Sequence, residues 1–407
     1  MSEGEFRPDP AVGLAIDDAS ILAEAATPGR FDVLATHGPA RAGRLWTAHG
    51  PVDTPCFMPV GTYGAVKGLT PDDLERAGAQ VVLGNAYHLT HRPGYELVAR
   101  LGGLHKFMGW SRAILTDSGG YQVFSLRGLQ KIDEDGVDYR THFDGSAQRM
   151  TPRSVLEVQA GLGSDICMVL DHCPPGDADR ATVLDAMRRT TRWAEEAARA
   201  RAEILAPGQL CFGIVQGGTD LELRARHLEE ITALPFDGIA LGGLSVGEPT
   251  PAMHATIAAV APSMPRERPR YVMGIGTPAD LLVAVRSGID MFDCVMPSRH
   301  ARNGQLFTWQ GRMNIRRAEF REDPAPLDPT CGCPACRGVS RAYLRHLHAQ
   351  NDPLYGRLAT LHNLYFYAQW VAVLRRALRS GTFESTFEVL SRVISSHYPV
   401  AAAGDAP

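Results

Sequence analysis

Short apolar runs recur along the chain from residue 57 onward, and each is followed by glycine or polar residues. Most are then followed by a segment with the period of an amphipathic helix. Eight runs have this form: Phe57–Val60, Val81–Leu83, Ile114–Thr116, Ile166–Leu170, Cys211–Val215, Ile239–Leu241, Tyr271–Ile275 and Met291–Val295. The clearest helical segments lie between the later runs: Ala178–Leu205, Leu221–Ala233, Met253–Val260 and Pro278–Ser287. This alternation predicts an α/β fold, a (β/α)8 TIM-type barrel; a doubly wound parallel sheet is the alternative.

Segments outside the alternation predict additional elements. Residues 31–56 form short alternating stretches broken by glycine and proline, which is typical of a small N-terminal antiparallel sheet. Gly136–Phe143, followed by the turn Asp144-Gly145-Ser146, predicts a hairpin between the third and fourth barrel strands. We expect one barrel domain over residues 31–398, a disordered extension over 1–30 and a disordered tail over 399–407.

The composition excludes several classes of protein. A chain of 407 residues with 44% hydrophobic and 21% charged residues is typical of soluble globular proteins. No apolar run approaches the roughly 18 residues that a membrane-spanning helix requires. The N-terminal segment lacks the basic head and continuous apolar stretch of a secretory signal. We therefore expect a cytoplasmic protein that does not bind membranes.

Polar residues follow most of the predicted barrel strands. The carboxyl ends of barrel strands meet at one mouth, where barrel enzymes bind their substrates. Each polar residue taken alone could instead cap a turn, but their equivalent positions favour a shared site. The residues concerned are Asn85, Asp117, Asp171, Gln216, Gly242, Gly243, Gly274, Gly276 and Asp293.

Three carboxylates at one mouth suit chemistry on a glycoside. One carboxylate can attack a sugar carbon to form a covalent intermediate, while a second protonates the leaving group and later deprotonates the acceptor. A third is then free for recognition. Asp171 can accept from the N1–H and N2–H2 donors of a guanine-like base, while Gln216 and a glycine N–H serve its O6 atom.

A cluster of cysteines indicates a metal site. Cys331-x-Cys333-x2-Cys336 supplies three thiolates in one short segment, and the tetrahedral preference of zinc requires a fourth ligand. His346, His348 and His362 are candidates by spacing. The surrounding stretch, residues 298–345, holds nine arginines against four acids, an excess of positive charge that suits either an RNA backbone or a salt-bridged surface.

Several long motifs resemble those of tRNA-guanine transglycosylases, the bacterial queuine tRNA-ribosyltransferase family. The resemblance extends from Phe31 to about Tyr398. The motifs that carry it are Asp117–Leu126 (DSGGYQVFSL), Gly213–Gly218 (GIVQGG), Leu241–Glu248 (LGGLSVGE), Met291–Arg299 (MFDCVMPSR) and the cysteine cluster.

The resemblance implies an exchange of the wobble guanine (position 34) in tRNAs with GUN anticodons, those for Asp, Asn, His and Tyr. The queuosine precursor preQ1 replaces guanine by double displacement through a covalent enzyme–RNA intermediate. Asp293 is then the nucleophile at C1′ and Asp117 the general acid and base.

His362 becomes the fourth ligand of one structural zinc ion, in an insertion over about residues 305–365. The resemblance also implies a homodimer, with Tyr343 and His346 at its interface.

The resemblance assigns further residues to substrate binding, with Tyr121 and Met273 sandwiching the base and Leu244 and Glu248 adjusting to the aminomethyl group of preQ1. The residues implied to bind the base are Ser118, Gly119, Gly120, Tyr121, Asp171, Cys173, Gln216, Gly243, Leu244 and Met273. Those implied to bind RNA are Gly274, Ile275, Gly276, Thr277, Pro278, Ala279, Asp280, Ser298, Arg299, His300, Ala301 and Arg302.

The sequence departs from the family pattern after the fourth strand. The usual Asp-Glu-Cys-Thr is replaced by Asp171-His172-Cys173-Pro174, which removes a negative charge beside a pocket for a cationic group. Queuine is therefore an alternative incoming base. A metal-dependent barrel hydrolase and a non-catalytic tRNA-binding partner subunit are alternatives from other functional classes.

Overall fold

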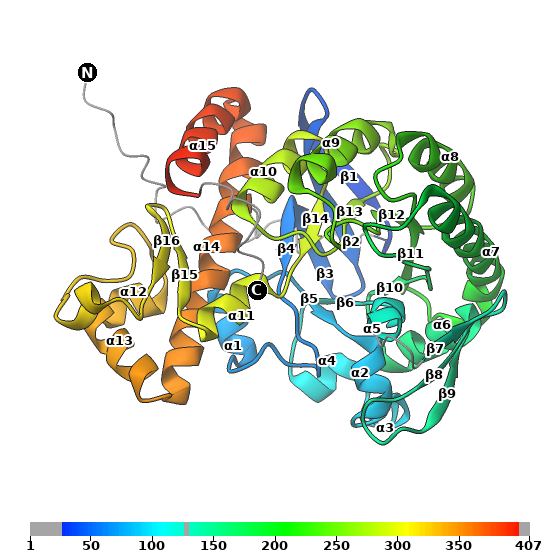
Figure 1. Cartoon of the computed structure of the whole chain (residues 1–407), viewed down its shortest axis with the longest axis horizontal. Coiled ribbons are helices and arrows are strands. Elements are labelled where there is room, and N and C mark those ends of the chain that lie inside the picture. Colours follow the sequence, from blue (N-terminus) through cyan, green and yellow to red (C-terminus); the bar gives the residue numbers. More distant parts are fainter. Residues whose placement is uncertain (1–26, 126–129, 399–407) are drawn as a thin grey trace.

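A closed barrel of eight parallel strands forms the centre of the molecule in the computed structural model, which describes residues 27–125 and 130–398 (Figure 1). The strands follow the order β4-β14-β13-β12-β11-β10-β6-β5, and a parallel bridge between Val60 and Leu83 closes the circle. Their bounds are β4 (Cys56–Met58), β5 (Val81–Gly84), β6 (Ala113–Thr116), β10 (Ile166–Met168), β11 (Leu210–Val215), β12 (Gly238–Leu241), β13 (Arg270–Val272) and β14 (Met291–Asp293). The predicted barrel is confirmed, and the doubly wound sheet is not observed.

Helices precede or follow the barrel strands, and most of them surround the barrel on its outer side (Figure 1). They are α1 (Pro71–Arg76), α2 (Ala86–His91), α3 (Tyr95–Arg100), α4 (Gly103–Met108), α5 (Gly120–Ser125), α6 (Pro152–Leu162), α7 (Arg180–Ile204), α8 (Leu221–Thr232), α9 (Thr250–Val260), α10 (Pro278–Arg286) and α11 (Met296–Arg302). Three of them, α1, α6 and α10, begin with a capping box formed by Thr70, Thr151 and Thr277, each followed by proline. The threonine hydroxyl accepts from a free helical N–H and proline fixes the first helical φ, so these starts are encoded locally.

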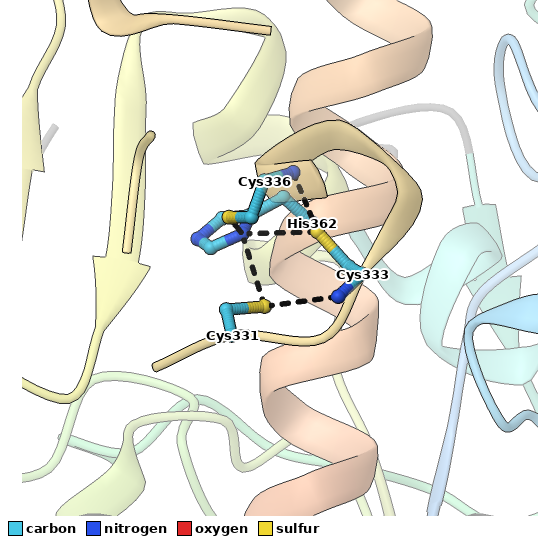
Figure 2. Close-up of side chains that lie close together, drawn as sticks. All are labelled: Cys331, Cys333, Cys336 and His362. Atoms are coloured by element: carbon cyan, nitrogen blue, oxygen red, sulfur yellow. Dashed lines mark hydrogen bonds between the residues drawn. The ribbon is translucent and has the colours of Figure 1, made fainter. Parts of the chain in front are cut away.

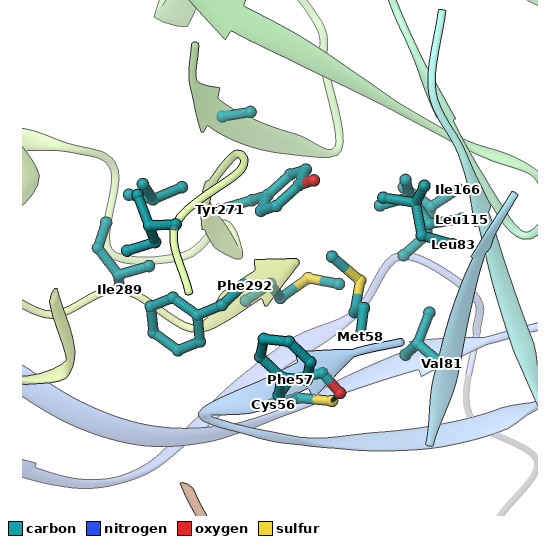
Figure 3. Close-up of a cluster of buried hydrophobic side chains, with 14 of the residues drawn as sticks. Cys56, Phe57, Met58, Val81, Leu83, Leu115, Ile166, Tyr271, Ile289 and Phe292 are labelled. Carbon is teal, nitrogen blue, oxygen red and sulfur yellow. Dashed lines mark hydrogen bonds between the residues drawn. The ribbon is translucent and has the colours of Figure 1, made fainter. Parts of the chain in front are cut away.

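The barrel interior is filled by apolar side chains from the strands. Figure 3 shows several buried side chains of the strands, including Met58 from β4, Leu83 from β5 and Tyr271 from β13; Phe57 instead lies on the outer side of the strand wall, where its ring meets that of Tyr367. Each is 5% exposed or less. Large and branched residues from neighbouring strands therefore close the barrel below its mouth, so that the polar rim rests on a dry, packed base.

Two three-stranded antiparallel sheets accompany the barrel in the described part of the chain. β1 (Phe31–His37), β2 (Ala40–Thr47) and β3 (Gly50–Thr54) form the predicted N-terminal sheet. Main-chain hydrogen bonds extend it to Gly29 and Arg30, which pair with Trp46. The predicted hairpin is present as β8 (Val137–Arg140) and β9 (Ala147–Met150), and β7 (Gln130–Ile132) adds a third strand. Of the disordered extension expected over residues 1–30, residues 27–30 belong to the described structure, and Gly29 and Arg30 pair with the sheet. Residues 1–26 and the tail 399–407 lie outside the described residues.

The C-terminal part of the chain adds a second layer beside the barrel. α14 (Pro353–Ser380) runs between the barrel and a group of smaller elements (Figure 1). The smaller elements are β15 (Gln305–Thr308), β16 (Gly311–Asn314), α12 (Pro334–Gly338) and α13 (Arg341–Ala349). α15 (Phe383–His397) packs on α14 and α10. Within the described ranges, no helix is both long and apolar enough to cross a bilayer.

Candidate active site and metal site

The polar residues predicted for the barrel mouth lie at the carboxyl ends of its strands. Asp117 directly follows β6, Gln216 follows β11 and Asp293 ends β14. Asp171 follows β10 by three residues, and Gly242 follows β12. Because the strands are parallel and form one barrel, these side chains share one rim.

Asp117 is buried and held by three hydrogen bonds. Its Oδ1 accepts from the N–H of Ala86 at 2.8 Å, and its Oδ2 accepts from Asn85 Nδ2 at 2.5 Å and from Gln122 Nε2 at 3.0 Å. Burial raises the pKa of Asp117 to about 6, helped by the charge of Asp293, although the three donors oppose the shift. The carboxyl group can therefore exchange a proton near neutral pH.

Asp293 has a different environment on the same rim. Its Oδ1 accepts from the hydroxyl of Tyr271 at 2.5 Å and from the N–H of Gly274 at 2.8 Å. Burial raises the pKa of Asp293, and these two donors oppose the rise. Because both donors are on Oδ1, they fix the carboxylate orientation and leave Oδ2 without a partner among the described residues.

Asp171, Gln216 and Gly243 lie together between the strand ends and form a candidate recognition surface. Gln216 Nε2 donates to Asp171 Oδ2 at 2.6 Å, whereas the buried Gln216 Oε1 has no hydrogen-bond partner among the described residues. A Cβ atom at Gly243 would lie 2.2 Å from that Oε1 atom, and the φ of 63° at this position also favours glycine. Burial raises the pKa of Asp171 to about 6. A carboxyl group, an amide and an exposed backbone therefore face one space.

The other residues predicted to bind the base surround this surface. Ser118 Oγ accepts from the N–H of Gly120, and Gly119 has a φ of 78°, so the turn after β6 is tight. Tyr121 on α5 is 55% exposed, and Met273 is half-buried at the end of β13. Leu244 is buried beneath the loop in which Glu248 accepts from the N–H groups of residues 245 and 246.

The three clustered cysteines meet His362 in a buried group (Figure 2). Their Sγ atoms lie 3.7, 3.5 and 3.3 Å from His362 Nδ1, for Cys331, Cys333 and Cys336 respectively. Tetrahedral bonds of about 2.3 Å to sulfur and 2.0 Å to nitrogen would separate these atoms by about 3.5 Å. His362 Nε2 donates to the carbonyl oxygen of Phe307 at 2.9 Å, which leaves Nδ1 free to bind an ion. The group could hold a metal ion, and the spacing candidates His346 and His348 are not part of it.

A second group of potential ligands lies near the opposite ends of the strands. Asp165 accepts from His49 Nδ1 at 2.8 Å and from His105 Nε2 at 3.0 Å. The two imidazole rings are stacked 3.5 Å apart and nearly parallel, at 14°. Ring nitrogens in parallel planes cannot both direct lone pairs at one ion, so this arrangement fits a hydrogen-bonded carboxylate.

Comparisons with known proteins agree with this geometry. The family model described as Queuine tRNA-ribosyltransferase matches residues 36–396. The chain belongs to this family. A relative named Queuine tRNA-ribosyltransferase from Solidesulfovibrio magneticus is 55% identical over 88% of this chain and 95% of its own length. Relatives with that name from Nitratidesulfovibrio vulgaris and Sorangium cellulosum are each 53% identical over 88% of this chain, covering 95% and 90% of their own lengths. The recognition of this transferase family from sequence motifs is confirmed.

The stretches predicted to bind RNA differ in how much of them reaches the surface. In this queuine tRNA-ribosyltransferase family member, Arg299 is exposed, Arg302 is partly buried, and Gly274 is exposed beside Asp293. Thr277 caps α10 with Asp280, which also bonds to His254 at 2.8 Å. Side chains of the stretch that face the interior belong to Ile275, Pro278, Asp280, Ser298 and Ala301. These residues therefore present little or no surface to a bound RNA in this conformation.

The side chain of His172, the departure expected from the family pattern, packs against α7 and α5. Its Nδ1 accepts from Arg189 Nη1 at 3.0 Å, and its ring lies 5.0 Å from that of Phe124. Burial lowers the pKa of His172 to about 4, so the ring is neutral near pH 7. The neighbouring thiol of Cys173 is also neutral, because burial raises its pKa to about 12. The replacement of glutamate therefore adds no positive charge at this position.

Some residues of the site carried no recognisable signal in the sequence. Tyr271 lies inside an apolar strand and looked like core, yet its hydroxyl reaches Asp293. Gln122 belongs to a family motif but had no assigned role, and it binds Asp117. Arg224 and His227 are ordinary residues of an amphipathic helix, and both are completely buried behind the recognition surface. Only the contacts between elements identify them.

Proposed function

We propose that the protein exchanges the wobble guanine (position 34) of GUN-anticodon tRNAs for preQ1 by double displacement. The observation that carries this proposal is the pair of carboxyl groups at the barrel mouth. Asp117 and Asp293 are close enough for the charge of one to raise the pKa of the other, and they have different hydrogen-bond partners. Different environments suit different roles, one group for attack and one for proton transfer.

In the first displacement, Asp293 Oδ2 attacks C1′ of the ribose and the C1′–N9 bond breaks. Guanine leaves with the bonding electron pair and takes a proton from Asp117. In the second, the carboxylate of Asp117 accepts the proton of the incoming base, whose nitrogen attacks C1′ and releases Asp293. The donors from Tyr271 and Gly274 on Oδ1 support the orientation required for attack.

The recognition surface supports a guanine-like base. Asp171 accepts from its N1–H and N2–H2 donors, while the Gln216 amide and the main chain at Gly243 serve O6. Tyr121 and Met273 enclose its faces. Glu248 supplies a carboxylate near the loop that would meet the cationic aminomethyl group of preQ1, and the neutral His172 does not counter it. These features suit the cationic aminomethyl group of preQ1.

The cysteine–histidine group suits one structural zinc ion per chain. Three thiolates and a neutral imidazole fill a tetrahedral site, so no coordination position is left for a catalytic water. That donor set supports a transferase with a structural metal over a metal-dependent hydrolase. Arg299, Arg302 and the basic stretch beyond them would contact the anticodon loop, in which an unpaired nucleotide is turned out at low cost.

The decisive experiment measures incorporation of labelled guanine into an unmodified tRNA-Tyr transcript. We expect incorporation by the wild-type protein, none into a transcript that lacks guanine at position 34, and stronger competition by preQ1 than by queuine. Asp293→Asn keeps the size of the side chain but removes the nucleophile, so it should bind tRNA and incorporate no label. Normal incorporation by that variant would exclude Asp293 as the nucleophile.

A folded, zinc-containing wild-type protein that binds tRNA but incorporates no guanine would contradict the catalytic proposal. It would instead support the non-catalytic partner subunit. Stronger competition by queuine would replace preQ1 as the incoming base without changing the proposed reaction.

A further inference from the structure

Helix α8 lies directly behind the base-recognition surface and directs two buried side chains at it. The helix begins at Asp220, whose Oδ1 accepts from the N–H groups of Glu222 and Leu223. This cap fixes the orientation of the first turn. Arg224 and His227 follow on the inner face, one turn apart, and both are 0% exposed.

The guanidinium of Arg224 joins the two loops that carry Gln216 and Gly243. Its Nη1 donates to the carbonyl oxygen of Val215 at 2.8 Å and its Nε to that of Gly218 at 2.8 Å, on either side of Gln216. Its Nη2 donates to the carbonyl oxygens of Gly242 at 2.8 Å and Gly243 at 3.3 Å. One planar group therefore spans both loops.

His227 supports the same loop from the next turn of the helix. The N–H of Gln216 donates to His227 Nδ1 at 2.7 Å, which fixes the peptide plane from which the Gln216 side chain extends. Burial lowers the pKa of His227 to about 4, so the ring stays neutral and can accept this bond. Gly217 allows the close approach, because a Cβ atom there would lie 3.0 Å from the backbone nitrogen of Arg224.

We propose that Arg224 and His227 are positioning residues for base recognition, which set the spacing between the Gln216 amide and the backbone of Gly243. They touch the loops and not the base. This inference rests on the proposed function for its choice of ligand. Burying a guanidinium costs desolvation free energy. Here its N–H groups donate to four main-chain carbonyl oxygens at once, which the planar fork of arginine allows.

The test compares Arg224→Lys, His227→Ala and the control Arg226→Met. Lysine keeps the charge but replaces the three donor nitrogens of the planar fork with one ammonium nitrogen. Arg226 is exposed on the same helix and paired with Glu230. Kinetics are measured with guanine and tRNA varied separately. We expect the KM for guanine to rise about tenfold in each of the first two variants, with kcat at saturating guanine and the KM for tRNA within about twofold of wild type. The control should be unchanged.

Hydrogen exchange provides a readout that does not depend on activity. Amides of residues 213–218 and 241–245 should exchange faster in Arg224→Lys than in wild type, while those of the other barrel strands keep their rates. A purely structural role would lower thermal stability and the active fraction, and therefore kcat, without raising the KM for guanine. An unchanged KM for guanine in both variants, or unchanged exchange in these loops, overturns the proposal.

Different results would contradict the proposed guanine exchange and the positioning role of Arg224 and His227. If the wild-type protein incorporates no guanine, the proposed function is contradicted, and the exchange rates alone then decide whether Arg224 holds the two loops together. If the wild type is active and His227→Ala alone raises the KM for guanine, Arg224 is excluded as a positioning residue.

Discussion

At the scale of single residues, the pKa values of Asp117 and Asp293 depend on a few neutral hydrogen-bond donors. Asp117 receives hydrogen bonds from Asn85, Ala86 and Gln122, and Asp293 receives them from Tyr271 and Gly274. Each donor stabilises the charged carboxylate and so lowers its pKa, against a burial effect that raises it. The balance brings the pKa of Asp117 to about 6, where it can exchange protons.

Replacing Gln122 by methionine tests this balance at Asp117. Gln122→Met removes one donor at nearly constant volume, so the pKa of Asp117 should rise further above about 6. In the proposed mechanism, proton donation to the leaving guanine requires protonated Asp117. The basic limb of kcat/KM for tRNA should therefore move to higher pH, by about half to one unit. Measurement of the pH–rate profile checks this.

The free energy of unfolding should also depend on pH through Asp117. A folded-state pKa above the ordinary value of about 4 means that the folded protein binds more protons between the two values, so the contribution of Asp117 to stability falls as pH rises from about 4 to about 6. In Gln122→Met the fall should extend to higher pH. Gln148→Met, on the exposed face of β9, is the control and should leave both profiles unchanged. A basic limb that does not move, or moves to lower pH, would exclude Asp117 as the proton donor.

At the scale of elements, the metal site joins segments that have no extended sheet of their own. Cys331, Cys333 and Cys336 lie around the start of α12, His362 lies on α14, and the carbonyl of Phe307 on β15 accepts from that histidine. An ion held by these ligands would fix α12 and β15 onto α14. Binding free energy at such a site contributes directly to folding.

Removing one ligand should therefore release this layer and leave the barrel intact. Cys336→Ser should lower zinc content from about one ion per chain, measured by elemental analysis, and should speed hydrogen exchange in residues 305–349. Binding of tRNA should weaken, whereas guanine binding should persist because Asp171 and Gln216 lie on the barrel. Cys167→Ala removes a buried thiol of β10 outside the group and should keep the zinc. Unchanged zinc in Cys336→Ser would contradict the assignment.

The positions of helices and strands could be predicted from the sequence better than the contacts between them. Apolar runs such as Val81–Leu83 predicted the barrel strands. A strand that is covered on both faces needs apolar residues at consecutive positions, so its sequence is a continuous apolar run. β7 was missed, since Gln130 and Lys131 interrupt any apolar pattern. The carboxylates could be placed on one rim because strand ends converge in a barrel. The roles of Tyr271 and Arg224 could not be predicted, because their hydrogen-bond partners lie on other elements that come together only in the folded protein.

At the scale of the whole molecule, the exposed face of α13 is a candidate for contact between two chains. Leu344 and Leu347 face the interior, while Tyr343 and His346 lie on the opposite, exposed face, one turn apart. Tyr343 is 42% exposed, a large aromatic side chain in contact with water. The homodimer implied by the family resemblance would bury it, and α13 lies on the far side of α14 from the barrel (Figure 1). A dimer there would leave the barrel mouths separate.

Sedimentation equilibrium decides whether this face associates. We expect the wild-type protein to sediment with about twice the 44.1 kDa mass of one chain. Tyr343→Ala removes the aromatic surface without affecting a buried contact, so it should shift the equilibrium toward monomer by about tenfold in dissociation constant. Arg188→Ala, on an exposed part of α7 across the barrel, should sediment like wild type. A wild-type monomer at micromolar concentration, or a Tyr343→Ala variant that dimerises normally, would show that this face does not hold two chains together.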